Sequence, residues 1–361
     1  MMHLTRSLRI LLALPRLLRL FGTRSTRADA LYIGDGADDT VKHFDAPTGA
    51  YLGTFVAPGS GGLHGPRGLL FSQGHFYVAN QNVQRPFAGE ILQYSGNTGR
   101  FLGALVPCNP PLSGDREPNT PWAPRGLLSG PGSTLYVADS GDGESPGRVL
   151  QFETTAGDFV GELDTTGFRE SFYPRGLVLG PDDLLYVSAS GNLAAGDELT
   201  GYVLRFHPHT GRFVDVFISN PANHPPADRT HHLHRPEGLV FGPDGNLYVT
   251  AFRAHPNDTD KILIFDGVTG AYVDQIDLDQ VGHPRAFAVA LLFGPGGYLF
   301  VPITGNGPET GAVRRYDITD RSFPFTHFVL PRARRGPLGQ PWYLTFGQTN
   351  PATLGYGVGI V

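Results

Sequence analysis

The chain has 361 residues, which is enough for one large or two medium domains with a sizeable hydrophobic core. Hydrophobic residues make up 40% and charged residues 17%, as in globular proteins, and the net charge of -5 argues against a general nucleic-acid-binding protein, which needs a basic face. The single cysteine, Cys108, excludes an internal disulfide framework and a metal site built from several cysteines.

Residues 1–27 differ from the rest of the chain because they hold six arginines and no acidic residue. On a helical wheel the four arginines from Arg6 to Arg19 lie on one side and the leucines mostly opposite, which predicts a basic amphipathic helix. Three interpretations stay open: an organelle-targeting or membrane-surface peptide, a secretory signal, or a dispensable extension. The uninterrupted apolar run 10–14 is far shorter than the ~20 residues that span a membrane. We therefore expect export, targeting or membrane contact only through residues 1–27, and a separate domain over residues 28–361.

An internal repeat organises the domain. Each unit opens with a Pro-x-Gly-Leu motif, continues through a turn and reaches a strand containing Tyr-Val: PRGLLFSQGHFYVANQN from Pro66, PRGLLSGPGSTLYVADSGDG from Pro124, PRGLVLGPDDLLYVSASGN from Pro174 and PEGLVFGPDGNLYVTAF from Pro236. Repetition at this scale is typical of solenoids, propellers and arrays.

Two further strands complete each unit. The expected third strands are 90–94, 148–152, 202–206 and 261–265. The hairpins that lead into the fourth strands contain Gly99, Gly157, Gly211 and Gly270, residues that suit a turn position with positive φ. Four strands per repeat is the content of a propeller blade.

The last two units are irregular. The fifth, LLFGPGGYLFV from Leu291, opens with 288–290 (Ala-Val-Ala) in place of Pro-x-Gly, and the sixth provides only an opening strand from Pro341. The missing strands of the sixth blade are at the start of the domain, in LYIGDG from Leu31, VKHFD from Val41 and AYLGTFV from Ala50. One C-terminal strand joined to three N-terminal strands would close the ring and remove its open edges. The sequence therefore predicts an all-β, six-bladed β-propeller of four-stranded blades.

The unit LYVADSGDG…GRVLQFETTAGDFVGEL resembles the NHL-repeat family, and the resemblance extends over residues 31–347. It implies a six-bladed propeller and no particular chemistry, because NHL propellers include enzymes, RNA-binding modules and protein scaffolds. More distantly the chain is similar to peptidyl-hydroxyglycine lyase and gluconolactonase-like propellers. The histidines of the lyases fall where this chain has Arg67, Arg125 and Arg175. The Glu, two Asn and Asp of the gluconolactonases have counterparts only in Glu237 and in Asn80 or Asp139.

In such a blade the innermost strand begins at the axis, and the residue between Pro and Gly should point into the central channel. Around the ring these residues are Arg67, Arg125, Arg175, Glu237, Val289 and Trp342. Arginines bind carboxylates and phosphates, so we expect an anionic group at Arg67, Arg125 and Arg175 and an apolar part against Trp342. In the alternative interpretation, Asp35, Asn80 and Asp139 at the ends of second strands pair with the arginines as structural partners. We count Asn80 and Asp139 among the candidate ligand contacts.

The spacing of the repeats indicates which face carries a site. Matched positions from Gly68 to Tyr343 are separated by 58, 50, 62, 52 and 53 residues, more than the ~40–45 that a four-stranded blade needs. Most of the surplus lies in the loops that lead into the innermost strands and in those that follow the second strands. Both kinds of loop emerge on one face, and insertions on one face indicate the binding side.

Histidines concentrate in one of these loops. His231, His232 and His234 precede Glu237, and His64 precedes Arg67, so a divalent metal such as Zn or Ca bound by these four histidines is a hypothesis. Alternatively, the histidines are solvated or hydrogen-bonded loop residues.

Two functions remain open. In the first, the axial mouth binds a small anionic molecule, a peptide or a protein partner. In the second, the mouth is the site of a lyase or hydrolase that uses Glu237 as general base with His234, with or without a divalent metal. Nucleic acid is an unlikely partner because the basic residues concentrate in residues 1–27 and 332–335.

Overall fold

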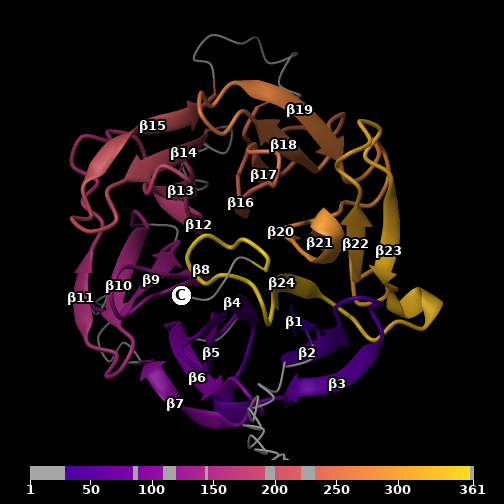
Figure 1. The fold of residues 1–361 in the computed structure, drawn as a ribbon, viewed down its shortest axis with the longest axis horizontal. Coiled ribbons are helices and arrows are strands. Elements are labelled where there is room, and N and C mark those ends of the chain that lie inside the picture. The colour runs from indigo at the N-terminus through magenta and orange to yellow at the C-terminus, as the bar shows by residue number, and fades with distance from the viewer. Residues whose placement is uncertain are drawn as a thin grey trace, which may run out of the picture.

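A computed structural model describes residues 29–83, 88–108, 119–142, 145–191, 200–220 and 232–357 of the chain. They form six four-stranded antiparallel sheets arranged as blades around a central axis (Figure 1). The predicted six-bladed β-propeller is therefore confirmed. The segment 1–27, with its predicted amphipathic helix, lies outside the described residues. Within the described ranges, no helix has the length and apolar character to cross a membrane.

The strands of each blade follow one another from the axis outwards. From the innermost to the outermost strand, the first three blades consist of β24 (Pro341–Phe346), β1 (Ala30–Asp35), β2 (Thr40–Asp45) and β3 (Tyr51–Val56); β4 (Pro66–Ser72), β5 (His75–Asn80), β6 (Glu90–Ser95) and β7 (Phe101–Val106); and β8 (Pro124–Ser129), β9 (Thr134–Asp139), β10 (Arg148–Glu153) and β11 (Phe159–Glu162).

The other three blades consist, in the same order, of β12 (Tyr173–Leu179), β13 (Leu185–Ser190), β14 (Gly201–Phe206) and β15 (Phe213–Ser219); β16 (Leu239–Phe241), β17 (Leu247–Ala251), β18 (Lys261–Phe265) and β19 (Tyr272–Asp277); and β20 (Leu292–Phe293), β21 (Leu299–Ile303), β22 (Ala312–Tyr316) and β23 (Phe325–Val329). Among the described residues, the segments Ser60–Gly62, Pro295–Gly297 and Arg332–Arg334 form short 3-10 turns between strands.

The ring closes as the sequence predicts. β24 pairs antiparallel with β1, so the first blade combines the C-terminal strand with three N-terminal strands. Asp35 at the end of β1 strengthens this closure: its carboxylate accepts backbone N–H groups of Gly339 at 2.8 Å and Gln340 at 2.7 Å, and the Lys42 ammonium at 2.6 Å. The hairpin glycines Gly99, Gly157, Gly211 and Gly270 have φ of +67°, +77°, +69° and +71°, as expected.

The hydrophobic core lies between the blades. The second strands alternate inward and outward, yet both of their faces are buried, because each blade packs against two neighbours. Tyrosines repeated at the Tyr-Val position fill the spaces between blades and are at most 1% exposed: Tyr77, Tyr136, Tyr186 and Tyr248.

The innermost strands approach one another closely near the axis. A Cβ atom on Gly126 would lie 2.7 Å from the carbonyl oxygen of Arg175, and one on Gly176 would lie 2.5 Å from that of Glu237. In the four units that have the Pro-x-Gly opening, the glycine is therefore required by the close packing of neighbouring innermost strands.

Candidate functional site at the propeller axis

Three arginines converge near the axis because the three innermost strands that carry them, β4, β8 and β12, are irregular at the opening motif. The register between β8 and β9 shifts between Pro124 and Leu127, so Arg125 and Gly126 have no paired residue in β9. The pairings of β4 with β5 and of β12 with β13 shift at the equivalent positions. A β-bulge re-aims the side chain that it carries. Arg67, Arg125 and Arg175 are therefore each displaced from the regular strand pairing. Arg67 and Arg175 both interact electrostatically with Arg125 and with Glu237.

The cluster holds one carboxylate for three guanidinium groups. Glu237 lies 3.7 Å from Arg125 and 3.9 Å from Arg175, and its own side chain is 4% exposed. Some ion pairs elsewhere are much shorter, such as that between Arg285 and Asp260 at 2.6 Å. Glu237 Oε2 is buried without a hydrogen-bond partner among the described residues. The glutamate is therefore near the arginines but does not saturate their donors.

Within the described ranges no carboxylate forms an ion pair with Arg67, although Glu237 and Asp39 act on it electrostatically from a greater distance. It is 5% exposed, its Nη1 donates to the carbonyl oxygen of Pro66 at 3.3 Å, and its guanidinium lies 4.2 Å from the ring centroid of Trp342. Burial, with the nearby charge of Arg125, lowers the pKa of Arg67 to about 9. Burial and Arg125 likewise lower the pKa of Arg175 to about 10. All three side chains are cationic at neutral pH, so the cluster has a surplus of buried positive charge.

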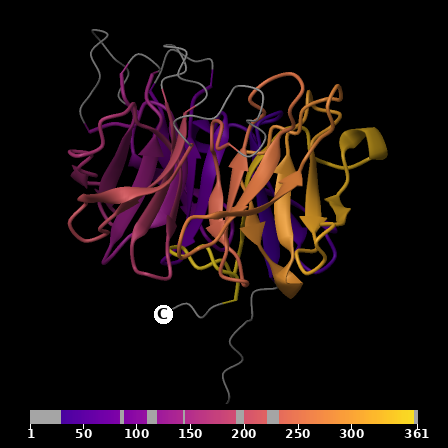
Figure 2. The same cartoon turned by 90° about the horizontal axis from the view of Figure 1, so that it is seen from above.

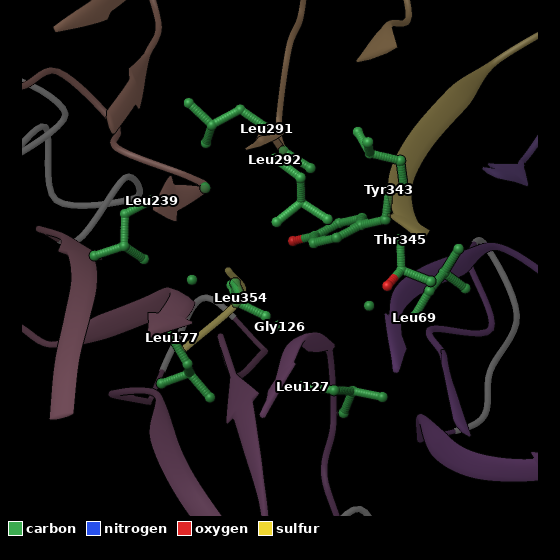
Figure 3. Close-up of a pocket in the computed structure, with 15 residues that line it drawn as sticks. Leu69, Gly126, Leu127, Leu177, Leu239, Leu291, Leu292, Tyr343, Thr345 and Leu354 are labelled. Carbon is green, nitrogen blue, oxygen red and sulfur yellow. The ribbon is translucent and has the colours of Figure 1, made fainter. Parts of the chain in front are cut away.

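Tyr343 is a further member of this cluster that the sequence motifs do not single out. It stands in β24 at the position where the regular units have glycine, and its side chain projects into the space between the innermost strands (Figure 3). The residue is 8% exposed and its hydroxyl has no hydrogen-bond partner among the described residues. Burial and the charge of Glu237 raise the pKa of Tyr343 to about 12, so its hydroxyl is protonated at neutral pH. The replacement of glycine by tyrosine in the aligned repeats was the available signal.

A small apolar chamber adjoins Tyr343 on the axis. Its volume is about 50 Å³, and it is lined by glycines and leucines of the innermost strands together with Leu354 (Figure 3). Leu354 belongs to the segment after β24, which lies at the lower face in Figure 2. Ser129 N–H donates to Pro351 O at 2.9 Å and Leu179 N–H to Ala352 O at 3.0 Å, so this segment is bound to the ends of β8 and β12. The axis is therefore covered at the face opposite the start of the innermost strands.

A second cavity of about 170 Å³ adjoins the cluster through Arg67 and Trp342. Its other lining residues include Asp39, His64 and Gln340. His64 Nδ1 lies 2.7 Å from Asp39 Oδ2 and His64 Nε2 lies 2.9 Å from the carbonyl oxygen of Val83, so both ring nitrogens have protein partners. We refer to this cavity as the side pocket.

The four histidines of the metal hypothesis are not assembled as one group by what the structure describes. His64 lines the side pocket, His232 and His234 are buried in the segment before β16, and His231 lies outside the described residues. In the part of the chain that the structure describes, no three His, Cys, Asp or Glu side chains are placed to hold a metal ion. Metal binding by this set stays a prediction.

The polar groups at the ends of second strands hold the loops that lead into the innermost strands. Asn80 accepts the His64 N–H at 2.7 Å and donates to Glu90 at 2.7 Å, and Asp139 accepts the Ala123 N–H at 2.8 Å. The charges near these residues are likewise local: Asp35 pairs with Lys42, and Asp139 lies 3.7 Å from Arg148. The described ion pairs thus do not connect Asp35 or Asp139 with the axial arginines, and ligand contact by Asn80 and Asp139 stays a prediction.

The predicted catalytic partners Glu237 and His234 are close in sequence, but no described hydrogen bond joins their side chains. His234 is 4% exposed, and burial with the charge of Arg235 lowers its pKa to about 4. The imidazole is therefore neutral at pH 7. A shared catalytic role of the two residues stays a prediction.

Comparison with known proteins gives a fold and no family. No protein-family model matches the chain, and no curated protein matches it. The solved structures similar to it include the periplasmic gluconolactonase of Pseudomonas aeruginosa, with a TM-score of 0.53, 18% identity and coverage of 82% of this chain and 81% of that one. The hydrazine synthase of Kuenenia stuttgartiensis has a TM-score of 0.51 at 19% identity and covers 80% of this chain and 73% of that one.

A catalytically inactive virginiamycin B lyase of Staphylococcus aureus, crystallised with quinupristin, has a TM-score of 0.47 at 14% identity and covers 84% of this chain and 85% of that one. At these identities the similarity concerns the fold alone, so the resemblance to NHL repeats stays a resemblance. The chain is a six-bladed β-propeller.

Proposed function

We propose that this propeller binds a small anionic ligand at its axis, between Arg67, Arg125 and Arg175. The observation that supports the proposal most strongly is the buried guanidinium of Arg67, which forms no ion pair with a described carboxylate, since Glu237 and Asp39 act on it only from a greater distance. A buried charge is costly unless it is paired, and a protein that retains one at such a place gains something from it. A bound anion would supply the missing pairing.

The charge of the site indicates the kind of anion. Three guanidinium groups outnumber the carboxylates that act on them, Glu237 and, at a greater distance from Arg67, Asp39, so the site has an excess of positive charge that a carboxylate, phosphate or sulfate group would balance. The same group can be carried by a small molecule or by the acidic end of a peptide or protein partner. Trp342 and the side pocket beside Arg67 provide room for the neighbouring part of the ligand.

Isothermal titration calorimetry with sulfate, at ionic strength held constant by chloride, tests the proposal. The wild type should bind one sulfate, and Arg67→Gln and Arg125→Gln should each reduce the affinity about tenfold or more, as the loss of a charged hydrogen bond predicts. Arg205→Gln is the matched control, because Arg205 carries the same charge but pairs with Asp215 away from the axis. Equal affinities in the axial and control variants would overturn the proposal.

A lyase or hydrolase is the second candidate, and one observation favours it. Glu237 Oε2 is buried beside guanidinium groups without a hydrogen bond, as a carboxylate that receives a proton from a bound substrate would be. Glu237→Gln separates the two functions. If the site only binds, removal of the competing carboxylate should strengthen sulfate binding. If the site is catalytic, the variant should bind sulfate but lose turnover of any ester or lactone substrate that the wild type consumes.

A further inference from the structure

We propose that Tyr343 is the specificity-determining residue of this site: its hydroxyl donates a hydrogen bond to the innermost oxygen of the anion, and its ring blocks the channel, so that only a terminal anionic group fits. This inference rests on the proposed function and adds the class of ligand, an anion attached to the rest of its molecule through a single bond. A carboxylate, a phosphate monoester or a sulfate monoester has this form.

The position of Tyr343 in the repeat gives the first reason. Regular innermost strands carry glycine here because a side chain would meet the next strand: a Cβ on Gly68 would lie 2.3 Å from the carbonyl oxygen of Arg125. β24 instead carries the largest departure from the pattern, a tyrosine whose ring extends across the axial space (Figure 3). A bulky residue at this one register position divides the channel into an upper charged part and a lower apolar part.

The hydroxyl gives the second reason. It is buried without a hydrogen-bond partner among the described residues, and it interacts electrostatically with Glu237, Arg125, Arg67 and Arg175. An unsatisfied buried hydroxyl is unfavourable, and a ligand oxygen that accepts its hydrogen bond would remove that cost on binding. Because the phenol remains protonated at neutral pH, it can act as a donor to an anion and add no negative charge of its own.

The chamber next to Tyr343 gives the third reason. It measures about 50 Å³, and its walls are mainly leucine side chains, including Leu354, and glycine backbone, with Thr345 as the one other polar side chain besides Tyr343 among its lining residues. Such a chamber offers an anion little to replace its hydration, so an anion has no favourable position beyond the hydroxyl. The substituent of the anion must then extend away from the chamber, towards the face that includes the side pocket.

Tyr343→Phe tests the hydrogen bond, because it removes one oxygen and keeps the ring. Sulfate affinity, measured by calorimetry, should fall about tenfold. The unfolding midpoint of the ligand-free variant in urea should stay the same or rise, because an unsatisfied hydroxyl has been removed. A merely structural tyrosine would show the opposite combination, with lower stability and unchanged affinity. Tyr248→Phe is the matched control, since that hydroxyl donates to Asp244 at 2.9 Å away from the axis and its loss should leave sulfate binding unchanged.

Ligand shape provides the second test. The wild type should bind methyl sulfate, which has one substituent, and should not bind dimethyl phosphate, which carries the same single negative charge but in which the anion lies between two substituents. Tyr343→Gly opens the channel towards the chamber and should reduce this discrimination. If the wild type binds both esters equally, or if Tyr343→Phe binds sulfate as the wild type does while Arg67→Gln does not, the role of Tyr343 is wrong and the axial anion site stands. If the wild type binds none of these anions, the proposed function itself fails.

Discussion

Arg67 shows how function and stability compete at the scale of one residue. Its guanidinium is buried against Trp342, and both burial and the neighbouring Arg125 disfavour its charged form. Folding therefore has to bury a cation that is not paired within the described residues. Such a residue is expected where a site is prepared for a ligand, and its removal should favour the folded state.

We predict that Arg67→Met raises the free energy of unfolding by about 1 kcal/mol, because it replaces a buried cation with an apolar side chain of similar length. Arg285→Met is the contrasting variant. Arg285 pairs with the buried Asp260 at 2.6 Å, so its loss leaves a buried carboxylate short of a partner and should cost about 3 kcal/mol. Urea denaturation of both variants checks the prediction. A large destabilisation by Arg67→Met would mean that Arg67 has a structural role.

The sequence predicted the charged residues of the site but not their arrangement. The position between Pro and Gly identified Arg67, Arg125, Arg175 and Glu237, because the repeat places equivalent residues at equivalent points of a ring. The distances of 3.7 and 3.9 Å to Glu237 depend on three-dimensional packing and could not be read from the repeat. Tyr343 was aligned with the glycines, but nothing in the sequence showed that its hydroxyl would be buried beside the arginines.

At the scale of elements, the innermost strands depend on glycine at the opening motif. A Cβ on Gly176 would lie 2.5 Å from the carbonyl oxygen of Glu237 and 2.7 Å from Leu239 Cδ2, so the strands would have to separate. We predict that Gly176→Ala costs about 2 kcal/mol and also weakens sulfate binding, because the bulge that aims Arg175 is displaced.

Gly347→Ala is the control for this substitution, since a Cβ there would have its first neighbour at 3.8 Å and the glycine does not have positive φ. Thermal unfolding and calorimetry of the two variants give the comparison. Equal stabilities would show that the close approach of the innermost strands is not a constraint.

The junction between β1 and β24 depends on Asp35, which is fully buried and accepts hydrogen bonds from Lys42 and from the backbone of Gly339 and Gln340 just before β24. Although burial alone raises the pKa of Asp35, these hydrogen bonds lower it below the ordinary value. Stability from a carboxylate with a lowered pKa is present above pH ~4 and is lost as the pH falls through the folded-state pKa.

We therefore predict that Asp35→Ala lowers the free energy of unfolding by about 3 kcal/mol at pH 7, and that the difference from the wild type shrinks below pH ~4. Urea denaturation at pH 7 and pH 3 measures both values. A difference that is the same at both pH values would contradict the role assigned to the ionised carboxylate.

The strand content of the elements was largely predictable, with some exceptions. Third strands and hairpin glycines follow directly from the repeat, as does the pairing of β24 with β1. β20 is only Leu292–Phe293 and β16 only Leu239–Phe241, and both begin after the opening position, although the unit of β16 has the Pro-x-Gly motif and that of β20 does not. The cover formed by Leu354 was not predicted, since the residues after β24 have no counterpart in the other units.

At the scale of the whole molecule, the propeller is a closed ring whose six blades pack around one axis. The first described strand, β1, begins at Ala30, and the described strands alone complete the six blades. We predict that a chain lacking residues 1–27 folds with the same far-ultraviolet circular dichroism and the same unfolding midpoint as the full chain. Loss of cooperative unfolding would instead assign these residues to the domain.

In the function proposed for this protein, the axis of the ring holds an anion between three arginines. The most direct measurement is the anomalous diffraction of a crystal soaked in selenate, an analogue of sulfate that is located by its selenium. We predict a single strong peak on the axis within hydrogen-bonding distance of Arg67, Arg125 and Arg175 and of the Tyr343 hydroxyl. Selenate bound only at surface arginines, with none at the axis, would contradict the proposed axial anion site.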